Sequence, residues 1–98
     1  MTPGIRYVLS FDTSYASLEV ALERAPAEIQ AHLARTREFR ARGVLLEAGA
    51  FRDPGRPLST MAMFTTREAA EEYAPGDPFV RNGMVVSRSI REWTDALG

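Results

Sequence analysis

The segment VLLEAGAFRDPGRPLSTMAMF, residues 44–64, contains two apolar runs on either side of a sharp turn. The first run, Val44 to Phe51, is long enough for a strand and too short for a typical helix. Pro54-Gly55 fits the two central positions of a type II turn, because proline presets φ and glycine accepts a positive φ. With Leu58 to Phe64 as the returning strand, the segment predicts a β-hairpin.

The residues before this hairpin predict one strand and two helical pieces. Arg6 to Phe11 follows the period of two that is typical of a strand whose faces have different environments. Ser17 can cap a short helix that Pro26 stops, since proline disfavours helical geometry in the residue before it. A longer helix is expected from Ala27 to Arg42, with Gly43 as its C′ residue.

The residues after the hairpin predict a helix, a single turn and a last strand. Thr65-Thr66-Arg67-Glu68 matches the capping box that opens a helix, which we expect to run through about Tyr73. Asp77-Pro78 is typical of an N-cap followed by proline, and it predicts a single helical turn closed by Gly83. The last strand is expected from Met84 to Trp93.

The predicted order β-α-β-β-α-β is that of a ferredoxin-like α+β fold with a four-stranded antiparallel sheet and both main helices on one face. The other face of such a sheet is bare. Met61 and Met63 alternate with Ala62 and Phe64, so the strand places apolar side chains on both faces. Because exposed apolar patches usually mark an interface, we expect a homodimer in which the bare sheets pack together.

The composition narrows the classes of function. A chain of 98 residues predicts a single domain with one modest core. Its 12 arginines and 13 acidic residues give no strong field of one sign, which argues against nucleic-acid and membrane partners. The sequence has no cysteine and one histidine, so we expect no metal site. With no targeting segment and no apolar stretch of membrane-spanning length, the expected location is the cytoplasm.

His32 is the only histidine, and histidine is the residue type that changes charge near neutral pH. A helical projection places it beside Ile29 and Phe39 at the border of an apolar stripe, so we expect a half-buried imidazole. Beside a carboxylate, such an imidazole can act as a general base. The alternative is a histidine at the edge of the core that one backbone carbonyl satisfies.

The other candidate residues each have a structural alternative. Asp77 can be a simple N-cap, or it can also accept a hydrogen bond from the imidazole. Glu47, in mid-strand, is either solvated at the rim, paired with Arg6 or Arg88, or a second catalytic carboxylate. Phe79 can anchor the core or line a pocket. Arg6 can bind an anionic substrate or face solvent.

Several short motifs are spread along nearly the whole chain. They comprise His32-Leu33, the strand Gly43-Val44-Leu45-Leu46-Glu47-Ala48-Gly49, Asp77-Pro78-Phe79-Val80 with Gly83, and Ile90-Arg91-Glu92-Trp93. Together these motifs resemble those of the YCII-related family. The resemblance implies a ferredoxin-like dimer similar to the dimeric α/β barrels. It also implies a site built on a His–Asp pair.

Carried over to this chain, the resemblance makes His32 and Asp77 the catalytic pair, and we expect Arg6, Glu47 and Phe79 to contact the substrate. The expected function is a small cofactor-independent enzyme that performs general acid/base chemistry on a small polar or anionic organic molecule. Lyase, isomerase and hydrolase reactions all fit. No phosphate-binding glycine loop or dinucleotide fingerprint indicates a cofactor. The alternatives are a non-catalytic metabolite-binding or accessory dimer and a purely structural module.

Overall fold

The computed structural model describes residues 4–97, and it confirms the ferredoxin-like α+β fold. Two short helices, α1 and α4, accompany the two main helices α2 and α3. The elements are β1 (Gly4–Thr13), α1 (Leu18–Arg24), α2 (Pro26–Ala41), β2 (Leu45–Phe51), β3 (Ser59–Phe64), α3 (Arg67–Gly76), α4 (Pro78–Arg81) and β4 (Val85–Asp95). Among the described helices, none combines the length and the apolarity that spanning a bilayer requires.

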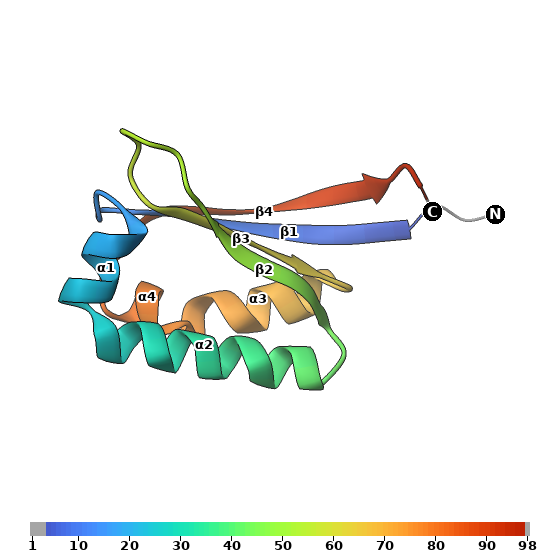
Figure 1. The fold of residues 1–98 in the computed structure, drawn as a ribbon. Coiled ribbons are helices and arrows are strands. Elements are labelled where there is room, and N and C mark those ends of the chain that lie inside the picture. The colour runs from blue at the N-terminus through green and yellow to red at the C-terminus, as the bar shows by residue number, and fades with distance from the viewer. Residues whose placement is uncertain (1–3, 98) are drawn as a thin grey trace.

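The strands form one antiparallel four-stranded sheet in the order β2-β3-β1-β4 (Figure 1). In the interior strand β1, Leu9 lies opposite Ala62 of β3 on one side and Ile90 of β4 on the other. β2 is an edge strand that pairs only with β3. Its register shifts between Leu45 and Glu47, which is the signature of a β-bulge.

Local signals in the sequence set most of the turns and helix ends. Ser17 Oγ accepts a hydrogen bond from the Val20 amide at 3.1 Å and caps α1, as expected. Thr66, one residue later than the capping box predicts, caps α3 through its side chain. The Pro54-Gly55 turn is confirmed, with Gly55 at φ +78°. Gly43 at φ +79° follows α2 in the left-handed region that glycine tolerates best.

Some boundaries differ from the sequence prediction. α3 continues past Tyr73 to Gly76 although Pro75 lies inside it. A proline in the last turn removes only one helical hydrogen bond, so this extension is tolerated. The extension is important because it brings the end of α3 directly to Asp77, which begins α4.

All helices lie on one face of the sheet, and the core fills the space between the two layers (Figure 1). Phe11 from β1 and Phe64 from β3 point into this layer together with Phe39 from α2 and Tyr73 from α3. All these side chains are almost fully buried. The helical layer is therefore anchored to the sheet mainly by aromatic packing.

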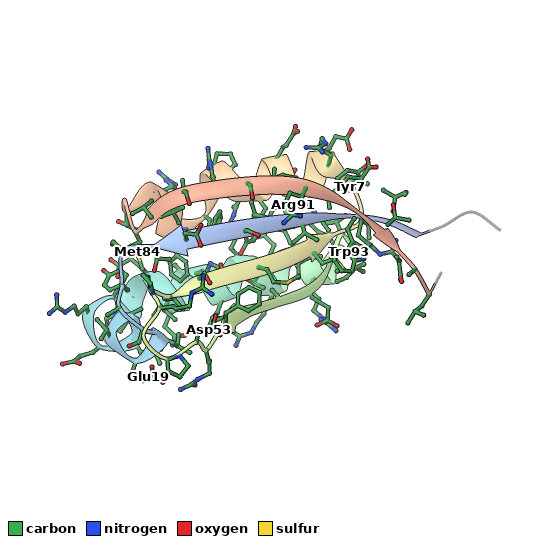
Figure 2. All side chains as sticks on the ribbon, turned by 90° about the horizontal axis from the view of Figure 1, so that it is seen from above. Tyr7, Glu19, Asp53, Met84, Arg91 and Trp93 are labelled. Carbon is green, nitrogen blue, oxygen red and sulfur yellow. The ribbon has the colours of Figure 1, made fainter. Side chains whose placement is uncertain are left out.

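Within the described part of the chain, no helix covers the opposite face of the sheet, as Figure 2 shows from above. Val8 and Met63 are paired across β1 and β3 on this face, and Met61 lies opposite Ser10. Trp93 of β4 lies on the same face and is 52% exposed. The bare apolar face predicted from the alternation of the methionines is confirmed.

Candidate functional site

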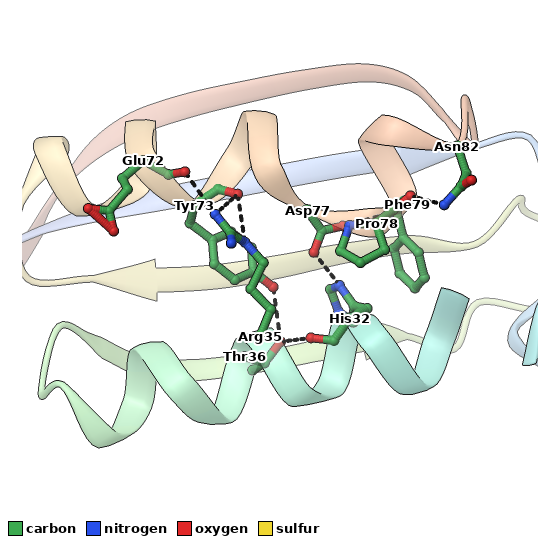
Figure 3. A network of polar contacts seen from close by, with 9 residues as sticks. All are labelled: His32, Arg35, Thr36, Glu72, Tyr73, Asp77, Pro78, Phe79 and Asn82. Carbon is green, nitrogen blue, oxygen red and sulfur yellow. Dashed lines mark hydrogen bonds and ion pairs between the residues drawn. The ribbon is translucent and has the colours of Figure 1, made fainter. Parts of the chain in front are cut away.

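The structure brings the predicted pair His32 and Asp77 into direct contact. His32 Nδ1 lies 2.6 Å from Asp77 Oδ1, and the two side chains are 16% and 0% exposed. His32 comes from α2 and Asp77 from the junction of α3 and α4, as Figure 3 shows. The expectation of a half-buried imidazole is confirmed. Its partner is a carboxylate, so the alternative of a lone backbone carbonyl is wrong.

Asp77 is held in place by its own capping role. It follows the last residue of α3 and is the N-cap of α4, where its Oδ2 accepts a hydrogen bond from the Phe79 amide at 3.0 Å. Each carboxylate oxygen therefore has one partner, the amide on one side and the imidazole on the other. The two interpretations of Asp77 are compatible, because the cap fixes the orientation in which the carboxylate meets His32.

Aromatic rings fix the plane of the imidazole. The Phe79 ring stacks on His32 with centroids 4.1 Å apart and an interplanar angle of 9°. Tyr73 meets the imidazole edge-on at 6.4 Å. These contacts hold His32 in a single orientation, so the nitrogen that faces away from Asp77 also has a fixed direction.

A second layer of hydrogen bonds supports the pair from behind. Thr36 Oγ1 donates to the His32 carbonyl at 2.8 Å and lies 2.9 Å from the Tyr73 hydroxyl. Burial raises the pKa of the Tyr73 hydroxyl above its ordinary value, and the negative charge of Asp77 raises this pKa further. Tyr73 therefore stays protonated and neutral beside the pair.

Arg35 ties the helix that carries His32 to the helix that ends at Asp77. Its guanidinium donates to the carbonyls of Glu72 at 3.0 Å and Tyr73 at 3.3 Å, in the last turns of α3. It passes so close to Gly76 that a Cβ there would lie 2.5 Å from Arg35 Nη2. Glycine at this position leaves room for the Arg35 guanidinium directly before Asp77.

A cavity of about 310 Å³ opens beside the pair, between α1 and α2 on one side and β2 and β3 on the other. Its wall is almost entirely apolar. His32 and Phe79 line it, as do Ile29 and Leu33 on α2 and Leu58 before β3. The pair is thus at the wall of a hollow, as a binding or catalytic site requires.

Arg6 and Glu47, two of the three residues expected to contact the substrate, lie away from the cavity. Arg6 pairs with Trp93 on the bare face of the sheet, and its Nη1 donates to the Ile5 carbonyl at 3.0 Å. Glu47 is exposed and lies opposite Met63, also on the bare face. None of the ion pairs within residues 4–97 joins Glu47 to Arg6 or Arg88, and β3 separates its edge strand from β1 and β4. Of the three predicted contact residues, only Phe79 lines the cavity.

Sequence reasoning missed the supporting residues Arg35, Thr36 and Tyr73. The sequence patterns indicated Tyr73 only as the end of a helix. The available signal was the spacing of Tyr73 and Asp77, which lie four residues apart, one helical turn. Within residues 4–97, no three His, Cys, Asp or Glu side chains gather as a metal site would require.

The comparisons with known proteins agree with this fold. The model of the YCII-related domain matches residues 6–94. No curated protein matches the sequence. Among solved structures, 5-chloro-2-hydroxyhydroquinone dehydrochlorinase from Burkholderia phenoliruptrix AC1100, in complex with 2,5-dihydroxybenzoquinone, has a TM-score of 0.61 at 15% identity, over 89% of this chain and 92% of that one.

Two further solved structures share the fold. A candidate antibiotic biosynthesis monooxygenase from Nitrosomonas europaea has a TM-score of 0.59 at 8% identity, over 98% of this chain and 94% of that one. A dimeric protein of unknown function with a ferredoxin-like fold, from Bacteroides fragilis, has a TM-score of 0.51 at 15% identity, over 92% and 94% of the two chains. At these identities the likeness shows the fold alone.

Proposed function

This chain belongs to the YCII-related domain family, and from that premise we propose that it is a small enzyme that performs general acid/base chemistry on a small organic molecule. His32 is the general base, and Asp77 is the residue that positions it. The observation that carries the proposal is the 2.6 Å contact between His32 Nδ1 and the fully buried Asp77 carboxylate, at the wall of a cavity.

The geometry supports a definite proton path. A carboxylate only accepts hydrogen bonds, so Nδ1 carries a proton and Nε2 of the neutral ring carries a lone pair. Nε2 takes a proton from a substrate in the cavity, and Asp77 stabilises the resulting imidazolium through Nδ1. The imidazolium then returns the proton to another substrate atom. No cofactor is needed for this cycle, which fits isomerase, lyase or hydrolase chemistry.

One test of this proposal is the effect of His32→Gln on proton exchange. A base that removes a carbon-bound proton, as in isomerase and lyase reactions, exchanges it with solvent, so incorporation of solvent deuterium at carbon in a panel of small hydroxylated molecules is a suitable readout. We expect His32→Gln to lower the rate by about 10²–10⁴-fold, the usual contribution of such a group. Gln30→Ala, an exposed change on the same helix, is the matched control and keeps the rate.

Two outcomes would contradict the proposal. One is turnover that persists in His32→Gln. The other is a nitrogen NMR spectrum of the histidine ring that places the proton of the neutral form on Nε2 rather than on Nδ1. If the cavity binds molecules and no member of the panel exchanges, the alternative function of a non-catalytic metabolite-binding protein replaces this one.

We also propose that the protein is a homodimer whose bare sheets pack face to face. Val8, Met61 and Met63 form the apolar centre of that face, and Phe51 and Trp93 beside it are 53% and 52% exposed. A stable interface buries about 1,200–2,000 Å² in total, and one sheet face can supply half of that. Sedimentation at micromolar concentration should give a dimer, and Met61→Glu should give a monomer. A monomeric wild-type protein contradicts the proposal.

A further inference from the structure

The cavity wall does not suit the polar or anionic molecule that the sequence predicts. Among residues 4–97, no arginine, aspartate or glutamate lines it. Leu22 and Leu33 line it from the helical side and are 48% and 36% exposed, so they form an apolar rim. An ion that enters such a cavity loses its hydration and finds no partner of opposite charge in the wall, which is strongly unfavourable.

Three of the four polar side chains of the wall, all except Thr60, have used their own protons. Thr36 donates its hydroxyl proton to the His32 carbonyl, which can only accept. At the 2.9 Å contact with Tyr73, the tyrosine hydroxyl is therefore the donor. The Nδ1 proton of His32 goes to Asp77 in the same way. The protons of these three side chains are all engaged within the protein.

What the wall offers instead is a lone pair. Nε2 of His32 makes no hydrogen bond to any described residue, and no side-chain nitrogen or oxygen is both buried and unpartnered among them. Nε2 is therefore accessible, on a ring that lines the cavity. A bound molecule satisfies this atom only by donating a hydrogen bond to it.

The volume of the cavity limits the size of the molecule. About 310 Å³ is at the lower end of the range of about 300–1,000 Å³ that is usual for small-molecule sites. The flat rings of His32 and Phe79, which both line the cavity and lie parallel to each other, suit a planar molecule. The available space thus matches one substituted ring.

We propose that the cavity takes an uncharged, single-ring molecule that donates one hydrogen bond to His32 Nε2, a phenol or a cyclic enol, and that it excludes carboxylates and phosphates. This inference rests on the proposed function only in that both use the same lone pair on Nε2. Such a molecule buries its ring against the leucines and presents its most acidic proton to the general base.

Three probes of equal ring size test the inference. p-Cresol carries the donor, p-methylanisole carries a methyl group in place of the hydroxyl proton, and p-toluate carries a charge. Dissociation constants are measured on the full chain by titration, followed through the amide NMR signals of Ile29, Leu33 and Thr60 at the cavity. We expect p-cresol to bind about tenfold more tightly than p-methylanisole, the factor that one hydrogen bond supplies. p-Toluate should bind more weakly than both.

Two variants sharpen the result. His32→Phe removes the acceptor, so p-cresol and p-methylanisole should bind equally. Leu22→Arg places a cation at the exposed rim, where it leaves the core intact, and p-toluate should then gain at least about tenfold in affinity. Equal binding of p-cresol and p-methylanisole to the wild-type protein, tighter binding of p-toluate, or shifts that occur only outside the cavity would each overturn the inference.

The outcomes also separate this inference from the proposed function. Binding selective for p-cresol, with no proton exchange in any panel molecule, overturns the proposed catalysis and leaves the ligand class standing. Binding selective for p-toluate, together with proton exchange that depends on His32, overturns the inferred ligand class and leaves the proposed catalysis standing.

Discussion

The two halves of helix α2 face very different surroundings. The C-terminal half places Phe39 in a cluster with Phe64 and Tyr73, whose ring centroids lie 5.1 to 6.4 Å apart. The N-terminal half and the following turn, through Thr36, face a cavity of about 310 Å³. Protein interiors are normally packed too closely for a void of this size. The aromatic half holds the helix against the sheet, so the other half can remain open, and His32 lies on the open side.

The largest expected effect is a difference in the free energy of unfolding between variants at the two ends of the helix. Phe64→Ala in the aromatic cluster should lower the free energy of unfolding by about 3–5 kcal/mol, because it leaves a void that cannot collapse. Leu22→Ala at the cavity rim should cost less than about 1 kcal/mol, since that side chain is half exposed and already borders open space. Urea unfolding of both variants measures the difference. Similar losses would mean that the cavity end is as tightly packed as the cluster.

An intermediate effect is expected at Asp77, which connects the open half to α4. Asp77→Ala removes the N-cap and leaves Nδ1 of His32 without its acceptor, so we expect a loss of about 2–3 kcal/mol from the cap and the hydrogen bond together. Asp77→Asn keeps a good cap and should cost about 1 kcal/mol. Thermal or urea unfolding of the Asp77→Ala and Asp77→Asn variants measures these costs. Equal costs would show that capping is not the stabilising role of this residue.

The smallest effect is a dependence on alkaline pH at Tyr73, which borders both regions. Burial raises the pKa of Tyr73 above its ordinary value of about 10, so its contribution to stability is complete below about pH 10 and is lost as the pH rises through the folded-state pKa. The loss approaches about 1.4 kcal/mol per pH unit. At neutral pH, Tyr73→Phe should lower the free energy of unfolding by about 1 kcal/mol, because it removes one hydrogen bond. The variant has no hydroxyl to ionise, so it should not lose this stability at alkaline pH.

The free energies of unfolding of the wild type and of Tyr73→Phe should therefore converge above pH 10. Thr36→Val is the matched control, because it removes the same hydrogen bond and keeps the tyrosine. A constant difference between wild type and Tyr73→Phe across the alkaline range would show that the hydroxyl is not held in its neutral form by burial.

Local patterns in the sequence were sufficient for the elements and for their order. Alternation, caps and the Pro54-Gly55 turn act within a few residues, so they can be interpreted without knowledge of the tertiary structure. The pairing of His32 with Asp77 came from the family resemblance. Their spacing in the sequence, 45 residues, carries no information about distance in space.

The misplaced residues show what local patterns leave out. Glu47 was expected among apolar neighbours in mid-strand, but the bulge at Leu46 and the edge position of β2 turn it to solvent. Arg6 was a plausible cation for a substrate until the pairing with Trp93 showed which face of β1 it occupies. Both outcomes depend on strand order and register, which involve contacts between distant segments.

Trp93 has a practical consequence for anyone who studies this protein in solution. It is the single tryptophan of the chain, and it lies half exposed on the face of the sheet opposite the cavity. Intrinsic indole fluorescence therefore comes from one known place. A change in emission will report that this face has been covered, while a ligand that enters beside His32 will leave the signal almost unchanged.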